Sequence, residues 1–239
     1  MSPLASHFSL HLRELRRRVF IAFAAVFLAA AVAYFFSRPL SQLFMVPLFA
    51  AAPDLTGLVY TNLTEAFIAY LKISILVGLI GAFPVILYQA WMFVMPGLHK
   101  QEKKLVLTIV FWATTLFIFG VCFAYFVVMP RALMFLMSFS GENLEALPKL
   151  DSYLTFIVRT SLAFGLSFEI PFLMVAAGKM NLVAQDYFIR QRVYFYLAIL
   201  VLSFLLTAGD LFSAMLLAIP LFGLYELGIA VMKIFLWRK

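Results

Sequence analysis

The feature that most constrains this chain is a set of apolar runs too long to be core segments of a soluble domain. The first run, 19–36, has 18 residues and no charged side chain, and a run of that length is typical of a transmembrane helix. Hydrophobic residues make up 65% of the 239 residues and charged residues only 12%. A soluble domain is closer to half apolar and a quarter charged, so the sequence predicts an integral membrane protein.

The sequence divides into apolar segments that leave no room for a separate soluble domain. Lipid offers no partners for free backbone groups, so each spanning segment must be a helix. The sequence therefore predicts an all-α membrane protein with six transmembrane helices, forming one membrane domain over residues 1–239. The segments are 19–36, 65–95, 105–128, 152–177, 193–206 and about 211–236.

The starts of several segments carry local signals. Basic residues precede 19–36, as they do in a secretory signal, but this run is longer than the apolar core of about 7–15 residues found there. We therefore interpret it as a retained helix. Asn62 with Glu65 three residues later resembles a capping box, and Asp151 or Asp210 can cap the helix that follows it.

The fifth segment, 193–206, is short for a membrane span. Its 14 residues reach about 21 Å as a helix, whereas the hydrocarbon layer is about 30 Å thick. A short helix can thin the bilayer or bring polar groups and water beside it. Burial among longer helices is an equally good interpretation from length alone.

Lysine and arginine are distributed unequally between the two sides of this topology. Of the 18 basic residues, 13 precede the first segment, lie in or next to the second or fourth connection, or lie at the end of the last segment or beyond it. Three lie on the other side, and the remaining two, Lys72 and Arg159, fall within spans near their outer ends. Because cytoplasmic connections carry the excess of Lys and Arg, both termini are predicted to be cytoplasmic.

Several classes of chemistry lack the residues they need. A single cysteine, Cys122, excludes an intrachain disulfide and a multi-cysteine metal site. His7, His11 and His99 lie outside the apolar segments, which argues against a serine–histidine protease, histidine-ligated haem or an HExxH zinc site in the membrane. The chain has no GxxxxGK[ST] nucleotide motif, and it has too little polar surface to bind nucleic acid despite its net charge of +7. We expect no enzyme activity, no cofactor and no metal.

Only three acidic residues lie on the predicted cytoplasmic side, Glu14, Glu102 and Asp186. On spacing alone, structural interpretations are favoured: Glu14 can pair with Arg17 or Arg18 along a helix, Glu102 lies at a helix start, and Asp186 belongs to a polar loop. The functional alternative is that Glu14 and Glu102 approach one another and receive a cationic partner. Two carboxylates on either side of a slot bind the planar guanidinium group of arginine better than they bind the ammonium group of lysine.

Within the membrane, Glu169 is the strongest candidate for a functional side chain. An ionisable group deep in a span is costly and marks a functional site by default. Pro171, two residues later, loosens the local backbone. The alternative is a protonated or hydrogen-bonded packing residue, and the same alternative holds for Glu226 near the inner end of the last segment.

Six stretches of the sequence together resemble the TatC family, the multispanning core subunit of the twin-arginine protein translocase. The resemblance extends over all six predicted spans and agrees with a short fifth helix; it also implies a short sixth one. The stretches are HLRELRRR (11–18), FPVILYQAW (83–91), HKQEKK (99–104), FAYFVVMP (123–130), AFGLSFEIP (163–171) and LLAIPLFGLYELG (216–228).

The resemblance implies a function and a set of site residues. Members of the family bind the twin-arginine signal peptides of folded precursors at the cytoplasmic face of the prokaryotic plasma membrane. They work with the single-span partners TatA and TatB in a self-associating complex powered by the proton-motive force. The implied signal-binding residues are Glu14, Glu102, Arg16 and Phe93, and the implied membrane or partner-helix residues are Glu169, Pro47 and Asp210.

Two other classes of function remain open from the residues themselves. A proton-coupled secondary transporter would use Glu169 as its coupling site, although the sequence shows none of the repeated halves typical of such transporters. A membrane enzyme or assembly factor is opposed by the placement of the histidines.

The turn before the last segment departs from the pattern of the TatC family, because Ala208 and Gly209 precede Asp210 where the family has two prolines.

Overall fold

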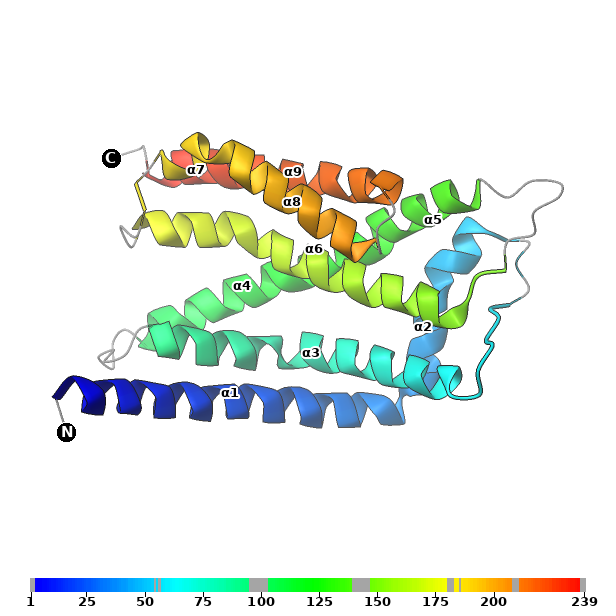
Figure 1. Ribbon diagram of the computed structural model, residues 1–239, viewed down its shortest axis with the longest axis horizontal. Coiled ribbons are helices and arrows are strands. Elements are labelled where there is room, and N and C mark those ends of the chain that lie inside the picture. The colour runs from blue at the N-terminus through cyan, green and yellow to red at the C-terminus, as the bar shows by residue number, and fades with distance from the viewer. Residues whose placement is uncertain are drawn as a thin grey trace. The chain divides into compact units, whose positions relative to one another are not determined.

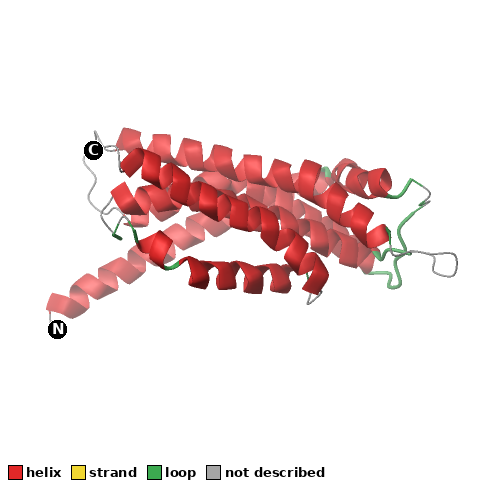
Figure 2. Cartoon of the chain, turned by 90° about the horizontal axis from the view of Figure 1, so that it is seen from above, coloured by secondary structure: helices red, strands yellow, loops and turns green. Residues whose placement is uncertain are grey.

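The structure is a computed structural model that describes residues 3–53, 55, 57–94, 103–138, 147–179, 183–184, 186–207 and 211–236. The described part of the chain consists of helices and connecting loops without a named strand (Figure 2). In chain order (Figure 1), the elements are α1 (Pro3–Phe35), α2 (Ser37–Ala51), α3 (Glu65–Val94), α4 (Lys103–Phe123), the π-helical turn η1 (Ala124–Val128), α5 (Met129–Met137), α6 (Leu150–Lys179), α7 (Tyr187–Arg190), α8 (Arg192–Leu206) and α9 (Leu211–Leu236).

The predicted membrane spans are confirmed as helices. Among the described residues, five helices are long and apolar enough to cross a membrane, and Arg192–Leu205 is a shorter apolar helix. Helix α8 has 15 residues, which gives it a length of about 22 Å, so the fifth span is short as expected. Helix α9 has 26 residues and is long enough to cross, so the implied shortness of the sixth span is not seen in its helix.

Two helices extend beyond the limits that the sequence predicted. Helix α1 begins at Pro3 and includes the basic stretch 11–18, because nothing in that stretch breaks a helix. The third span was expected to end at Met129–Pro130, but helical structure continues to Met137. The π-helical turn η1 precedes Pro130, which occupies the first turn of α5, where a missing backbone N–H costs nothing.

Helix α2 was not predicted from the sequence. Pro39 and Pro47 interrupt this segment, and proline inside a helix removes one backbone hydrogen bond. Pro39 lies in the first turn, where a proline is tolerated. Pro47 lies inside the helix and is buried, so its neighbours have to compensate for the missing bond.

The chain divides into two compact units. The first unit comprises Met1–Ser41 with Phe67–Thr115, and the second comprises Gln42–Ala66 with Leu116–Lys239. The single membrane domain expected over residues 1–239 stays a prediction.

In the first unit, α1 and α3 pack side by side along their lengths (Figure 1). They are in close contact at Gly78, where an added Cβ would lie 2.5 Å from the backbone nitrogen of Ala30. Near the start of α3, the rings of Tyr34 and Phe67 meet edge to face at 6.4 Å between centroids. The glycine therefore sets the distance between these two helices.

In the second unit, α6 packs against α9, η1 and α8, and α8 packs against α9. An added Cβ at Gly228 of α9 would lie 2.5 Å from the sulfur of Met174 in α6, so the two helices are in close contact there. The fully buried Phe164 of α6 contacts the ring of Phe123 at 5.8 Å between centroids. This aromatic contact joins α6 to the end of α4.

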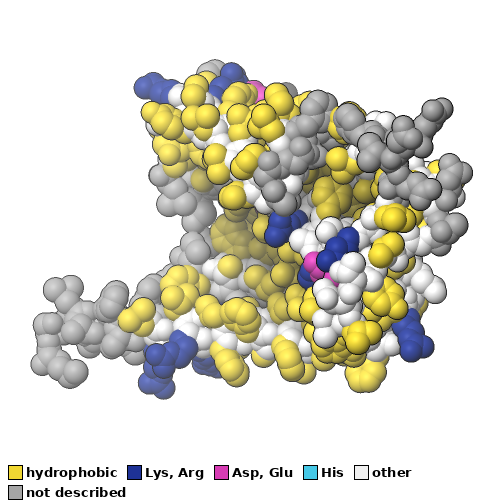
Figure 3. Space-filling model, turned by 45° about the vertical axis from the view of Figure 1, so that its right-hand side comes forward, with side chains coloured by type: hydrophobic (Ala, Val, Ile, Leu, Met, Phe, Trp, Pro, Cys, Tyr) yellow, Lys and Arg dark blue, Asp and Glu magenta, His cyan; other side chains and the backbone are white. Residues whose placement is uncertain are grey.

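Much of the described surface is apolar. Large hydrophobic side chains of α1 are exposed, including Phe20, Phe23, Phe27 and Phe35, and hydrophobic side chains cover much of the face in Figure 3, with basic side chains in a few places. In water an exposed apolar surface of this extent would cause aggregation. It is the surface expected of a helix that faces lipid.

Candidate functional site

A polar pocket of about 270 Å³ lies between the first part of α1 and the last part of α3. Its lining combines one carboxylate, two guanidinium groups, an amide and one apolar side chain. These belong to Glu14, Arg17, Arg18, Gln89 and Ile21. The pocket lies wholly within the first compact unit.

Glu14 is held by Arg18, one helical turn further along α1. The Nε of Arg18 donates to Oε1 of Glu14 at 3.1 Å, and its Nη2 forms an ion pair with the same oxygen. The sequence predicted this i, i+4 pairing, which is typically worth a few tenths of a kcal/mol on a helix surface. Opening this pair therefore costs little free energy.

Gln89 is a pocket residue that sequence reasoning missed. Its side-chain amide can both donate and accept hydrogen bonds, and it lines the pocket opposite α1. Phe93 lies four residues further along α3, so the two side chains share one face of the helix. A signal was available, because Gln89 is the only Asn or Gln in the 65–95 segment.

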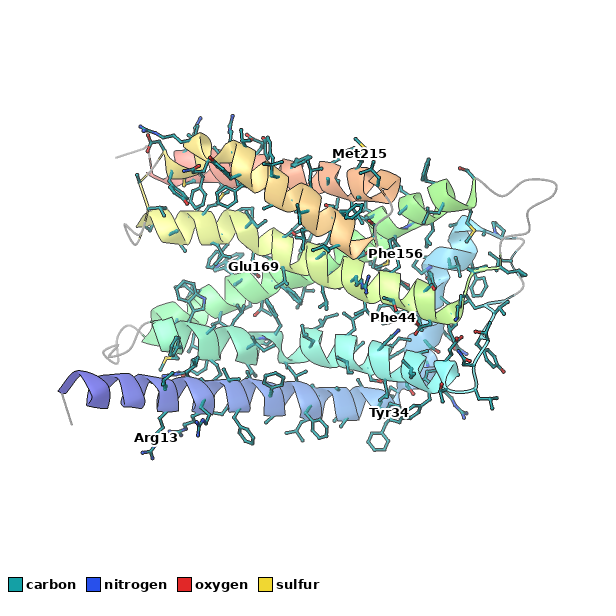
Figure 4. The ribbon with its side chains drawn as sticks, viewed as in Figure 1. Arg13, Tyr34, Phe44, Phe156, Glu169 and Met215 are labelled. Carbon is teal, nitrogen blue, oxygen red and sulfur yellow. The ribbon has the colours of Figure 1, made fainter. Side chains whose placement is uncertain are left out.

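The other predicted signal-binding residues are placed differently. Arg16 is exposed on α1 and is not among the residues that line the pocket. Its neighbour Arg13 projects from α1 away from α3 (Figure 4). Glu102 lies outside the described residues, so its approach to Glu14 stays a prediction.

The charge balance of the described lining matters for what it can bind. One carboxylate, Glu14, faces two guanidinium groups, Arg17 and Arg18. Within this described lining, a cation is attracted by Glu14 and repelled by Arg17 and Arg18. A planar cation that donates two parallel hydrogen bonds satisfies the carboxylate better than a point charge does.

Glu169 is buried in α6, with only 5% of its surface exposed (Figure 4). Its Oε1 atom has no hydrogen-bond partner among the described residues. Ser161, about two turns earlier on α6, and Ser203 of α8 are also buried, and their hydroxyl oxygens lack partners in the same part of the chain. A buried polar atom without a hydrogen-bond partner carries a cost in free energy.

Pro47 acts on the structure through the carbonyl groups that precede it. Proline lacks the N–H that would bond the carbonyl of Leu43, four residues earlier. The hydroxyl of Tyr125, in η1, donates to that carbonyl. The hydroxyl of Tyr153, in α6, donates to the next carbonyl, of Phe44, at 2.7 Å.

Glu65 fixes the start of α3, although it does so without the reciprocal bonds of the capping box that the sequence predicted. Its carboxylate accepts hydrogen bonds from the backbone N–H of Thr61 and the side chain of Asn62 at 3.0 and 3.1 Å. Lys149 lies 2.8 Å from the same carboxylate, and Val59 forms an isolated β-bridge with Lys149. Two connecting segments of the second unit are thereby joined.

Asp210, the remaining residue of the predicted site, lies outside the described residues.

Glu226 has a packing role in the second unit. Its carboxylate accepts a hydrogen bond from Arg192 at 2.8 Å and another from the hydroxyl of Tyr196. The hydroxyl of the neighbouring Tyr225 donates to the backbone carbonyl of Phe188 at 2.7 Å.

Across the described ranges, no group of three or more His, Cys, Asp or Glu side chains is placed to hold a metal ion.

Apolar helices of spanning length and a charged pocket at the end of the α1–α3 pair define a multispanning α-helical membrane protein. Residues 10–220 match the family described as "Sec-independent protein translocase protein (TatC)". The chain therefore belongs to the TatC family.

Relatives of the same description cover nearly the whole chain. The protein from Desulforapulum autotrophicum is 38% identical over 234 residues, which is 98% of this chain and 87% of the relative. The protein from Escherichia coli K12 is 35% identical, covering 92% of this chain and 85% of its own length. The relative from Aquifex aeolicus is 34% identical, covering 96% and 95%.

The fold is also that of a solved structure. A crystal structure of the twin arginine translocase receptor TatC superposes with a TM-score of 0.84 at 34% identity, covering 94% of this chain and 98% of that one. The chain is accordingly a component of a protein translocase, with several membrane-spanning helices, and not an enzyme. Membership of the TatC family therefore decides against the two other classes of function considered, a solute transporter and a membrane enzyme.

Proposed function

We propose that the pocket at Glu14 is where this chain binds the twin-arginine signal peptides of folded precursor proteins. The observation that carries the proposal is the ion pair between Glu14 and Arg18 beside the amide of Gln89. An incoming arginine takes the place of Arg18 on Glu14, and the second arginine of the ligand is met by Glu102. The related crystal structure is described as that of a twin arginine translocase receptor, which supports the same role here.

Phe93 and Arg16 complete the proposed site at its edges. Phe93 follows Gln89 by one turn and offers an aromatic face, on which a guanidinium group stacks favourably. Arg16 is exposed and adds a positive charge beside the pocket, which repels cations that cannot form the paired hydrogen bonds. The site therefore prefers arginine to lysine.

The second part of the proposal concerns the partner proteins. The unpartnered Oε1 of the buried Glu169 supports a contact with a polar group on a single-span helix of the TatA or TatB type. Pro47 and Asp210 contribute to the same transport cycle. The chain works in a complex that contains several copies and draws on the proton-motive force.

The topology of the proposal follows from the distribution of basic residues. Both termini are cytoplasmic, and the membrane is the prokaryotic plasma membrane. The Glu14 pocket supports this orientation, because it joins the arginine-rich start of α1 to the end of α3 that leads into the lysine-rich second connection. Signal peptides then meet the pocket from the side on which precursors fold.

The experiment is a binding measurement with the full chain in detergent micelles. A twin-arginine signal peptide binds, and a twin-lysine version binds at least about tenfold more weakly, since charge-assisted paired hydrogen bonds are lost. Glu14→Gln and Glu102→Gln each weaken binding strongly while folding and insertion are unchanged. Equal binding of the two peptides contradicts the proposal.

A further inference from the structure

A second pocket lies at the start of α8, within the second compact unit. It has a volume of about 430 Å³, within the range of about 300–1,000 Å³ for ligand pockets. Its lining combines two phenol rings, a phenyl ring, an amide and one small side chain. These belong to Tyr187, Tyr194, Phe195, Gln191 and Ala198. None of these residues belongs to the signal-peptide site proposed at Glu14.

The lining follows one face of α7 and α8. Positions 187, 191, 194 and 198 are spaced by four, three and four residues, so they share a helix face. At the join between the two helices, the backbone N–H of Gln191 donates to the carbonyl of Tyr187 at 3.0 Å. The same face continues along α8 with the exposed Val201 and Leu205. A pocket with polar groups at one end of an exposed apolar strip suits an amphipathic ligand.

Basic side chains outnumber acidic ones at this end of the second unit, where α6 and α9 end and α8 begins (Figure 1). The described residues of 175–198 and 226–236 contain four basic side chains and two acidic ones. The basic ones are Lys179, Arg190, Arg192 and Lys233, and the acidic ones are Asp186 and Glu226. The local charge therefore favours an anionic ligand.

The two arginines on either side of Gln191 in the sequence have hydrogen-bond donors beyond those in their ion pairs. A guanidinium group carries five N–H donors. Arg190 pairs with Asp186 through Nη2, and 78% of its side chain is exposed. Arg192 donates to Glu226 through Nη2, whereas its buried Nε has no hydrogen-bond partner among the described residues. A phosphate group bound beside Gln191 would accept hydrogen bonds from donors of this kind.

We propose that this pocket binds the phosphate headgroup of an anionic phospholipid, with an acyl chain along Val201 and Leu205. The tyrosine hydroxyls and the amide of Gln191 donate to the headgroup, and the neighbouring arginines supply the positive charge. Tyrosine is enriched where a helix enters the membrane, and basic pockets between membrane helices bind anionic headgroups. The seven positions from Ala198 to Leu205 extend about 10 Å, which fits within one leaflet of the hydrocarbon layer, about 15 Å thick.

The test measures lipid binding to the full chain in uncharged detergent micelles by native mass spectrometry. The two probes are dioleoyl phosphatidylglycerol and dioleoyl phosphatidylcholine, which have the same acyl chains and differ in headgroup charge. We expect phosphatidylglycerol to bind at least about tenfold more tightly, and Arg190→Gln to weaken its binding about fivefold, the usual effect of one basic residue beside an anionic headgroup.

A second pair of variants tests the position of the ligand. Ala198→Phe fills the pocket with a ring and is expected to weaken phosphatidylglycerol binding at least about tenfold, as a misfitting group does in an apolar site. Leu197→Phe is the matched control, because Leu197 is an exposed neighbour on α8 outside the lining, and it leaves binding unchanged. Binding of a twin-arginine peptide stays unchanged in all three variants, which shows that the chain is folded.

Each contrary result contradicts a different part of the assignment. Equal affinity for the two lipids overturns the anionic headgroup. Phosphatidylglycerol binding that survives both Arg190→Gln and Ala198→Phe places the lipid elsewhere. Inorganic phosphate that binds as tightly as the lipid identifies a free anion as the ligand. A photocrosslinker at position 198 is expected to capture phosphatidylglycerol in a bilayer, and capture of only a protein helix contradicts the proposal.

Discussion

The hydroxyl of Tyr125 donates a hydrogen bond to the backbone carbonyl of Leu43, the group that Pro47 leaves without its helical donor. The hydroxyl of Tyr153 donates to the neighbouring carbonyl of Phe44. Two tyrosines from η1 and α6 thus satisfy the backbone of α2 where proline interrupts it. The part of α2 around Pro47 is therefore held by side chains from elsewhere in the second unit.

This relationship predicts an energetic coupling between Tyr125 and Pro47. Tyr125→Phe leaves the Leu43 carbonyl without a donor and lowers the free energy of unfolding by about 0.6–1 kcal/mol, the usual size of a hydrogen bond inside a membrane protein. Pro47→Ala restores a backbone N–H, so Tyr125→Phe costs less in that background. Thermal unfolding of the two single variants and the double variant in micelles measures the coupling. Additive effects contradict the account.

The contact between α1 and α3 predicts opposite results at two glycines one turn apart. Gly78→Ala forces a Cβ to within 2.5 Å of the Ala30 backbone, whereas the same change at Gly81 meets no atom within 4 Å. Alanine favours a helix by up to about 1 kcal/mol at either site. Gly81→Ala is therefore neutral or stabilising and Gly78→Ala is destabilising, as measured by thermal unfolding. Equal effects at both positions disprove this packing.

The buried carboxyl group of α6 predicts a graded response. Glu169→Gln keeps a polar group that can hydrogen-bond a partner helix, whereas Glu169→Ala removes it, so transport falls further with alanine than with glutamine. Export of a folded reporter carrying a twin-arginine signal measures the effect. Signal-peptide binding serves as the control and stays unchanged in both variants. Normal export by both variants restores the interpretation of Glu169 as a packing residue.

The ion pair within the pocket predicts that Arg18 competes with the ligand. Arg18→Gln removes one partner of Glu14 and raises the affinity for a twin-arginine peptide by about twofold, in line with a pair worth a few tenths of a kcal/mol. Discrimination against a twin-lysine peptide decreases at the same time. Arg17→Gln is the matched control, since it removes the same charge from the lining without the Glu14 pair. Weaker binding by Arg18→Gln contradicts this role.

Much of the fold could be predicted from the sequence, because lipid leaves few choices for an apolar chain. The limits of α6 and α9 follow from the apolar runs to within a few residues. Helix α2 could not be predicted, since its prolines argue against a helix until the hydroxyls of Tyr125 and Tyr153 are seen to satisfy the backbone. The continuation of the third span past Pro130 depends on the π-helical turn, which no local pattern announces.

The candidate site was predicted in part. The pairing of Glu14 with Arg18 is a local contact along one helix, so sequence spacing was sufficient to find it. Gln89 comes from another helix, and its position opposite Glu14 depends on how α1 and α3 pack at Gly78. The burial of Glu169 followed from its place in a span, whereas the lack of a partner for its Oε1 depends on the surrounding helices.

The most direct test of the central claim compares two carboxylates that each form an ion pair with an arginine. Glu14 and Asp186 each pair with an arginine four residues later, but only Glu14 lines the pocket. The affinity of a twin-arginine peptide is predicted to fall at least about tenfold in Glu14→Gln, as expected for losing a charge-assisted hydrogen bond, and to be unchanged in Asp186→Asn. Equal affinity for Glu14→Gln and the unmodified chain would show that this carboxylate does not receive the arginine pair.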